Sequence, residues 1–134
     1  MSAVSAQQPK VAIIGFGEAG SLFGAGLREA GLANVAAIDP TLADPARAWL
    51  VEKANASGVV ILSNAAEVAD YDLVLVLVQP AVAVAVAKEY ASRLRPDTLY
   101  VDLTSCGPQQ KQEICGIIEA EGARFVDAAM LGSV

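Results

Sequence analysis

Near the start of the chain lies a glycine-rich turn, Gly15-Phe16-Gly17-Glu18-Ala19-Gly20, which matches the pattern G-x-G-x-x-G. The apolar run Lys10–Ile14 directly before it is typical of a strand buried on both faces of a sheet. From Glu18 to Ala30 apolar residues recur at helical spacing, and Gly31 is placed to end the helix in a left-handed conformation. The pattern predicts a strand, a tight turn and a helix in immediate succession.

An acidic residue at the end of the next predicted strand gives this turn a chemical meaning. The strand is Val35–Ile38, and Asp39 follows it, 24 residues after Gly15. In a dinucleotide-binding unit an acidic side chain at this place accepts hydrogen bonds from the adenine-ribose hydroxyls. The alternatives are a strand-to-helix turn that binds nothing and an Asp39 that serves only its own turn.

Each glycine of the turn has its own predicted task. Gly15 permits the tight turn, Gly17 lets the backbone approach a pyrophosphate, and Gly20 allows close packing of helix on strand. No Gly-Lys-Ser/Thr follows, so the turn is not a Walker-type phosphate loop. The predicted cofactor-binding turn consists of Gly15, Phe16, Gly17, Glu18, Ala19 and Gly20.

Asp39 also predicts which nicotinamide dinucleotide binds. Its carboxylate repels a 2′-phosphate, so NAD is favoured over NADP. The next residues, Pro40-Thr41-Leu42, include no arginine that could receive that phosphate. Arg47 is the nearest arginine, and we interpret it as a solvated residue of the second helix.

Strands and helical crossovers alternate along the rest of the chain. Ala81–Ala87 alternates with period two, which favours a strand, but Pro80 suits a first helical turn and a parallel sheet needs a crossover here, so we predict a helix. The alternation predicts an α/β fold of Rossmann type, a doubly wound parallel sheet with helices on both faces, in one domain over residues 1–134. The further predicted strands are Val59–Leu62, Leu73–Val78, Thr98–Leu103 and Arg124–Val126, and the further helical segments are Asp44 to about Ala56, Ala65–Ala69 and Pro108–Glu121.

Composition limits the partners and the location. The net charge of −6 argues against nucleic acid and anionic membranes. Two cysteines and no histidine argue against a disulfide framework and a metal site, and they favour a reduced, cytoplasmic protein. The apolar stretch Leu73–Ala87 is too short to span a bilayer, and Pro80 breaks it. Hydrophobic residues make up 54% of the chain, above the usual ~45–50%, which suggests a surface that a partner or a second domain covers.

Three further segments carry a family resemblance. They are Tyr71–Pro80, Val101–Pro108 and Phe125–Ser133. With the glycine turn they resemble, in order and spacing, the β-hydroxyacid dehydrogenase family, which includes 3-hydroxyisobutyrate and 6-phosphogluconate dehydrogenases. The resemblance covers nearly all of the chain after Gln8.

The resemblance implies additional site residues. Val78, Gln79 and Pro80 are implied to lie along the cofactor, and the hydroxyls of Thr104 and Ser105 near the nicotinamide. Gly132 and Ser133 match the family's substrate loop, but Leu131 stands where the family has a serine that holds the substrate carboxylate. That departure concerns the substrate and leaves the cofactor assignment intact.

The implied activity is hydride transfer between the nicotinamide and a small hydroxyacid-type substrate. The family's general acid/base lysine is expected beyond Val134, in a substrate and dimerisation domain absent from this chain, through which the full-length protein forms a homo-oligomer. The chain alone is then expected to bind cofactor without turnover, with Met130 and Leu131 exposed or buried by self-association. The alternatives are a stand-alone NAD-binding or sensing module, or the cofactor domain of an imine or ketopantoate reductase.

Other chemistry-bearing residues receive plainer interpretations. Lys111, Glu113 and Cys115 fall on a predicted helix, where solvated or core roles outweigh catalysis. Cys106 lies in a predicted site loop, but nothing beside it in the sequence indicates an activated thiolate.

Overall fold

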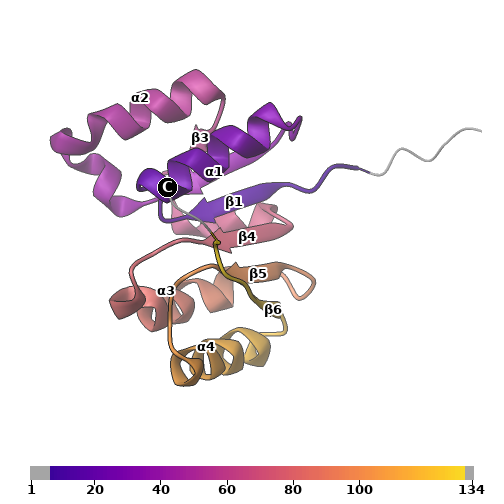
Figure 1. Ribbon diagram of the computed structural model, residues 1–134. Coiled ribbons are helices and arrows are strands. Elements are labelled where there is room, and N and C mark those ends of the chain that lie inside the picture. Colours follow the sequence, from indigo (N-terminus) through magenta and orange to yellow (C-terminus); the bar gives the residue numbers. More distant parts are fainter. Residues whose placement is uncertain (1–6, 132–134) are drawn as a thin grey trace, which may run out of the picture.

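The computed structural model describes residues 7–131, in which six parallel strands lie between two pairs of helices (Figure 1). The strands are β1 (Val11–Ile14), β2 (Val35–Ile38), β3 (Val60–Ile61), β4 (Leu73–Val76), β5 (Leu99–Asp102) and β6 (Arg124–Asp127). The α-helices are α1 (Glu18–Glu29), α2 (Ala48–Ser57), α3 (Ala83–Tyr90) and α4 (Pro108–Ala120). Short 3₁₀ turns are η1 (Pro40–Ala43), η2 (Pro45–Arg47), η3 (Ala65–Asp70), η4 (Pro80–Val82) and η5 (Ala91–Arg93).

The order of the strands confirms the predicted Rossmann-type fold. Across the sheet they run β3-β2-β1-β4-β5-β6, the order of a doubly wound dinucleotide-binding sheet. The direction of winding reverses between β1 and β4, which are hydrogen-bonded neighbours from Val11 and Leu73 to Ile14 and Val76. Ligands of open parallel sheets bind at the carboxyl ends of the strands beside such a reversal.

Each face of the sheet has its own core. Ile13 and Phe16 pack with Leu50 of α2 on the face that α1 and α2 cover, whereas Ile14 and Tyr100 pack with residues of α3 and α4 on the other. Figure 1 shows the pair α1 and α2 above the strands and the pair α3 and α4 below them. The central strands are buried on both faces because of this arrangement, which explains their unbroken apolar sequences.

The segment with alternating Ala and Val is helical, as predicted, but the helix starts later. Pro80 opens the 3₁₀ turn η4, and α3 begins at Ala83. Ala83, Ala87 and Tyr90 are buried at helical spacing, so the two-residue alternation does not describe the buried face.

Two further predicted boundaries were wrong by two residues or more, whereas the other strand ends differ by at most one residue. The second helix was expected to begin after Asp44, but the Asp44 side chain accepts a hydrogen bond from the Ala46 N–H and caps η2, and α2 starts only at Ala48. Strand β4 ends at Val76 rather than Val78, because the following backbone leaves the sheet and enters the loop toward Pro80.

The end of the described chain is exposed, as expected. Leu131 is 96% exposed and Met130 is 38% exposed. Strand β6 forms one edge of the sheet, and Val126 on it is exposed too. Within residues 7–131 no helix is both long and apolar enough to cross a membrane.

Candidate functional site

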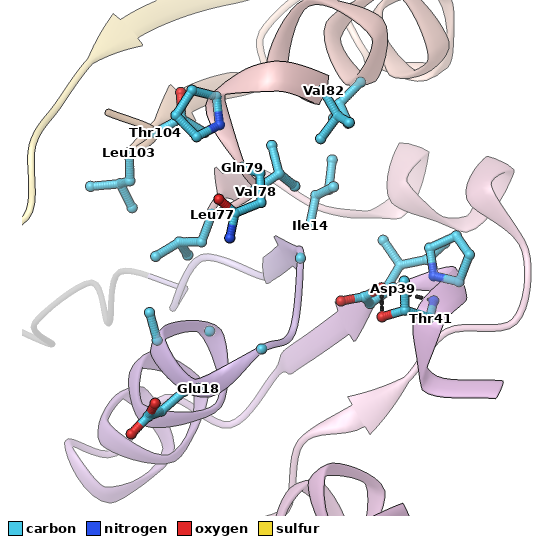
Figure 2. A pocket seen from close by; sticks show the side chains of 18 of the residues that line it. Ile14, Glu18, Asp39, Thr41, Leu77, Val78, Gln79, Val82, Leu103 and Thr104 are labelled. Carbon is cyan, nitrogen blue, oxygen red and sulfur yellow. Dashed lines mark hydrogen bonds between the residues drawn. The ribbon is translucent and has the colours of Figure 1, made fainter. Parts of the chain in front are cut away.

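A groove of about 540 Å³ lies at the carboxyl ends of the central strands. The loops that follow β1, β2, β4 and β5 contribute its walls. Figure 2 shows Asp39 and Thr41 at one end of the groove, Leu103 and Thr104 at the other, and Val78 and Gln79 between them. The predicted cofactor residues that line it are Gly15, Gly17, Glu18, Ala19, Gly20, Asp39, Val78, Gln79, Pro80, Thr104 and Ser105.

The three glycines of the turn differ in what surrounds them. Gly15 has a φ of +92°, and a Cβ there would overlap the Leu77 carbonyl oxygen. A Cβ on Gly20 would overlap the Gly15 carbonyl oxygen, so this glycine lets α1 start directly against the turn. Beside Gly17 nothing lies within 4 Å of a Cβ position. Gly15 and Gly20 are therefore required by the fold, whereas the space beside Gly17 is free for a ligand.

Phe16 is the one predicted residue of the turn whose side chain does not line the groove. Its ring is fully buried in the core beneath α1 and α2. Its backbone N–H donates a 2.8 Å hydrogen bond to Oδ2 of Asp39. Phe16 thus contributes a backbone group that ties the glycine turn to the end of β2.

Asp39 also accepts hydrogen bonds from within its own loop. Its Oδ1 accepts a 2.9 Å hydrogen bond from the Thr41 N–H and a 2.6 Å hydrogen bond from the Thr41 hydroxyl. The side chain is 12% exposed. The carboxylate therefore caps η1 and still borders the groove.

Arg47 corrects part of the interpretation made from the sequence. Its side chain is 40% exposed and so solvated, as expected, but Arg47 ends η2 ahead of α2 and its side chain lines the groove. Its Nη1 donates a 2.8 Å hydrogen bond to the Thr41 hydroxyl and lies 3.8 Å from Oδ2 of Asp39. A guanidinium and a carboxylate thus stand side by side at this end of the groove.

A second carboxylate lies beneath the opposite end. Asp102 is completely buried, and its Oδ1 accepts hydrogen bonds from the Thr104 N–H (2.8 Å) and the Thr104 hydroxyl. Lys111 of α4 donates a 2.9 Å hydrogen bond to the Asp102 carbonyl and pairs with Asp127 at 2.8 Å. Its Nζ is 3.5 Å from Oδ1 of Asp102. Lys111 is a core residue, one of the two roles expected for it, and the ion cluster around it was not predicted.

Two buried tyrosines near the groove remain neutral. Burial raises the pKa of the Tyr100 phenol, and the charge of Asp102 raises it further. The pKa of Tyr90, which lines the groove, is raised by burial and then by the charge of Glu89. Both phenols therefore keep their protons well above neutral pH.

Gly132 and Ser133, the predicted substrate-loop residues, lie outside the described residues. Among residues 7–131 no group of three His, Cys, Asp or Glu side chains is arranged to hold a metal ion. Both cysteines in the described part of the chain are free thiols.

A family model shows what kind of domain this chain is. Residues 10–134 match the model described as the NAD binding domain of 6-phosphogluconate dehydrogenase. The chain belongs to this family. It is an NAD(P)-binding domain of the hydroxyacid dehydrogenase type, as the resemblance implied. The comparison with curated proteins finds no match.

Solved structures agree with this family. The NAD(P)-binding domain is 35% identical to a conserved hypothetical protein of Sinorhizobium meliloti 1021, with a TM-score of 0.87 over 95% of this chain and 43% of that one. It is 26% identical to 3-hydroxyisobutyrate dehydrogenase of Mycobacterium tuberculosis, solved with L-serine, with a TM-score of 0.82 over 94% of this chain and 42% of that one.

An imine reductase of Myxococcus stipitatus in complex with NADP⁺ shares the fold. It is 21% identical, with a TM-score of 0.78 over 93% of this chain and 42% of that one. The NAD(P)-binding domain therefore spans less than half the length of each of these three structures.

Proposed function

We propose that this domain binds NAD(H) along the groove, in preference to NADP(H), and supplies the cofactor for a dehydrogenase reaction on a small hydroxyacid-type substrate. The observation that carries the proposal is the free space beside Gly17 at the start of α1. The first N–H groups of a helix have no partner within the helix, and they attract phosphate oxygens. A pyrophosphate can reach these groups because Gly17 has no side chain in the way.

The two ends of the groove suit the two halves of the cofactor. In a doubly wound sheet of this order the adenosine lies over the β1-β2-β3 half and the nicotinamide over the β4-β5-β6 half. We therefore place the adenine ribose at Asp39 and the nicotinamide at Thr104 and Ser105.

The preference for NAD rests on the Asp39 carboxylate. Phe16 and Thr41 already donate three hydrogen bonds to it, and a carboxylate has about four acceptor positions. One position remains for a ribose hydroxyl, while the negative charge repels a 2′-phosphate. Since Arg47 is close enough to offset part of that charge, we expect the preference to be on the order of tenfold.

Hydride transfer from a hydroxyl needs a proton acceptor, which the resemblance implies to be a lysine, and no lysine among residues 7–131 lines the groove. Of the lysines, Lys10, Lys53 and Lys88 do not line it, and the Nζ of Lys111 is held by Asp102 and Asp127. We therefore assign proton transfer, the substrate pocket and homo-oligomer formation to another part of a longer protein, with the cytoplasm as its location. The 134-residue chain is expected to show only background NAD reduction with 3-hydroxyisobutyrate, 6-phosphogluconate, L-serine or threonate.

Calorimetric titration of the chain with NAD⁺ and NADP⁺ tests the binding proposal. Wild type is expected to bind both, NAD⁺ more tightly. Gly17→Val is expected to lose binding of both while keeping its fold by circular dichroism, since its Cβ meets no protein atom. Gly26→Val is the matched control, because this second glycine of α1 also has free space around it but does not line the groove. Unchanged affinity in Gly17→Val would remove the glycine turn from the site.

A further inference from the structure

The ion cluster of Lys111, Asp102 and the 60% exposed Asp127 has no role in the function proposed so far. It joins three elements, because Lys111 lies in the first turns of α4, Asp102 ends β5 and Asp127 ends β6. Asp102 is completely buried and the Lys111 side chain is only 10% exposed. Removing two charges from water costs free energy that their attraction only partly returns, so a buried pair is a weak source of stability. A role in orienting a neighbouring group explains the cluster better.

The neighbouring group is the Thr104 hydroxyl. The Thr104 hydroxyl donates its only proton to Oδ1 of Asp102. The Thr104 N–H donates to the same oxygen. Both protons of Thr104 are therefore directed into the protein, and only the lone pairs of its hydroxyl oxygen remain for other partners.

The lone pairs of Thr104 are available at the groove. Cys106 Sγ lies 2.9 Å from the Thr104 hydroxyl oxygen, and with the hydroxyl proton on Asp102 the thiol is the donor in that contact. A thiol is a weak donor, which an amide N–H can replace. Thr104 lines the groove and so presents a hydrogen-bond acceptor to a ligand there.

We propose that Lys111 is a positioning residue for the nicotinamide: it holds Asp102 in place as the acceptor of the Thr104 hydroxyl proton, which makes the Thr104 hydroxyl oxygen a fixed acceptor for the NH₂ of the carboxamide. This rests on the proposed function, since it takes the β5 end of the groove as the nicotinamide end. Without Lys111, the Asp102 side chain would be free to turn away from the Thr104 hydroxyl. The hydroxyl could then rotate and present a donor, which the carboxamide NH₂ cannot use.

ADP-ribose separates this role from a purely structural one. It shares the adenosine, the pyrophosphate and the second ribose with NAD⁺ but lacks the nicotinamide. Damage to the fold or to the glycine turn weakens both ligands alike. A change in the orientation of Thr104 weakens NAD⁺ alone.

The experiment measures the Kd of NAD⁺ and of ADP-ribose for Lys111→Met, which keeps the aliphatic stem but removes the charge. We expect NAD⁺ to bind about tenfold more weakly, the effect of one hydrogen bond, with ADP-ribose within about twofold of wild type. Lys88→Met removes an exposed lysine of α3 outside the groove and is expected to leave both affinities unchanged. Lys111→Gln, which keeps a hydrogen-bond donor without the charge, replaces Lys111→Met if that variant does not fold.

A pair of substitutions at Thr104 completes the test. Thr104→Val keeps the shape but removes the acceptor, and is expected to repeat the loss seen in Lys111→Met. Thr104→Ser keeps the hydroxyl and should bind NAD⁺ as wild type does. Equal weakening of NAD⁺ and ADP-ribose, or unchanged NAD⁺ affinity in the Lys111 variants, would overturn the positioning role. A wild-type chain that binds neither ligand would instead overturn the proposed function, and this inference with it.

Discussion

The two ends of the groove are built from the same local motif. Asp39-Pro40-Thr41 follows β2, and Asp102-Leu103-Thr104 ends β5 and continues into its loop. In each, one carboxylate oxygen accepts hydrogen bonds from both the N–H and the hydroxyl of the threonine two residues later. Each carboxylate also has a cation within 4 Å, Arg47 in one case and Lys111 in the other.

The difference lies in burial. Asp39 and Arg47 both reach the groove, and the second oxygen of Asp39 receives the Phe16 N–H. Asp102 has no exposed surface, and its Oδ2 accepts no hydrogen bond from any described residue. In the exposed Asp39–Thr41 turn, the carboxylate can therefore contact a ligand directly. In the buried Asp102–Thr104 turn, the carboxylate can affect a ligand only through Thr104. The local sequence determines the conformation of the turn, and the packing around it determines whether its carboxylate can reach a ligand.

The two turns should differ most in how much stability is lost when their carboxylate is removed. Asp102→Ala leaves the buried Thr104 hydroxyl and N–H without their acceptor and takes one anion from Lys111, so we expect a loss of about 3 kcal/mol in the free energy of unfolding. Asp39→Ala removes a partly exposed cap and should cost about 1 kcal/mol. Urea denaturation of both variants measures the difference. Equal losses would show that burial does not distinguish the two turns.

The same contrast explains how much of the site could be predicted from the sequence. The glycine turn and Asp39 were found because their signals are local: fixed glycine spacing, a strand before, a helix after and an acid at the next strand end. Lys111 was predicted to lie in a helix, but its partners were not predicted. Asp102 and Asp127 come from two different strands, and no residue spacing along the chain indicates that they contact Lys111. Thr104 and Ser105 were named only through the family resemblance.

Arg47 was missed for a different reason. The fold, with all six strands in their places, followed from the alternation of apolar runs and helical periodicity. The start of the second helix did not, because Asp44 and Pro45 favour a helix and a 3₁₀ turn equally well at the level of sequence. That turn brings the Arg47 guanidinium to the Thr41 hydroxyl at the groove, although the side chain stays 40% exposed.

The exposed turn at Asp39 should control whether NAD⁺ or NADP⁺ binds more tightly. Asp39→Ser removes the negative charge that repels a 2′-phosphate and the remaining acceptor position for a ribose hydroxyl. We expect NAD⁺ to bind about tenfold more weakly and NADP⁺ to change little, so that the preference nearly disappears. Parallel titrations with the two cofactors measure this ratio. A wild-type chain that binds NADP⁺ more tightly would contradict the premise.

Replacing Arg47 should shift the preference toward NAD⁺, opposite to Asp39→Ser, and by a smaller factor. Arg47→Ala removes the cation nearest to where a 2′-phosphate would lie, so NADP⁺ should bind about three- to fivefold more weakly and NAD⁺ should bind nearly as before. Because the Arg47 side chain is 40% exposed, raising the salt concentration should reduce the NADP⁺ affinity of wild type more than that of the variant. An equal loss for both cofactors would mean that Arg47 serves the Asp39 turn and not the ligand.

Asp72 is a third carboxylate with an ion-pair partner, but it lies away from the groove. Replacing it should have the smallest effect of these variants, and it tests whether an ion pair outside the groove affects cofactor binding. Asp72 accepts a 2.8 Å hydrogen bond from the Lys10 N–H and pairs with Arg95 at 2.8 Å, at the end of the sheet away from the groove. The Lys10 N–H and then the Arg95 guanidinium hold the pKa of Asp72 below its ordinary value. A carboxyl with a lower pKa in the folded chain stabilises it above the unfolded pKa of about 3.9, and this contribution is lost as the pH falls through the folded value.

Asp72→Asn should therefore lower stability at neutral pH by less than about 1 kcal/mol, since the side chain is 51% exposed and solvent screens the pair. The difference between variant and wild type should shrink as the pH is lowered from about 5 toward 2, because wild type then loses the same ionised carboxylate. Urea midpoints across that range measure it, and NAD⁺ affinity at neutral pH should be unchanged. If Asp72→Asn weakened NAD⁺ as strongly as Asp39→Ser, ion pairing would affect binding through the sheet as a whole, and proximity to the groove would no longer explain why Asp39 matters.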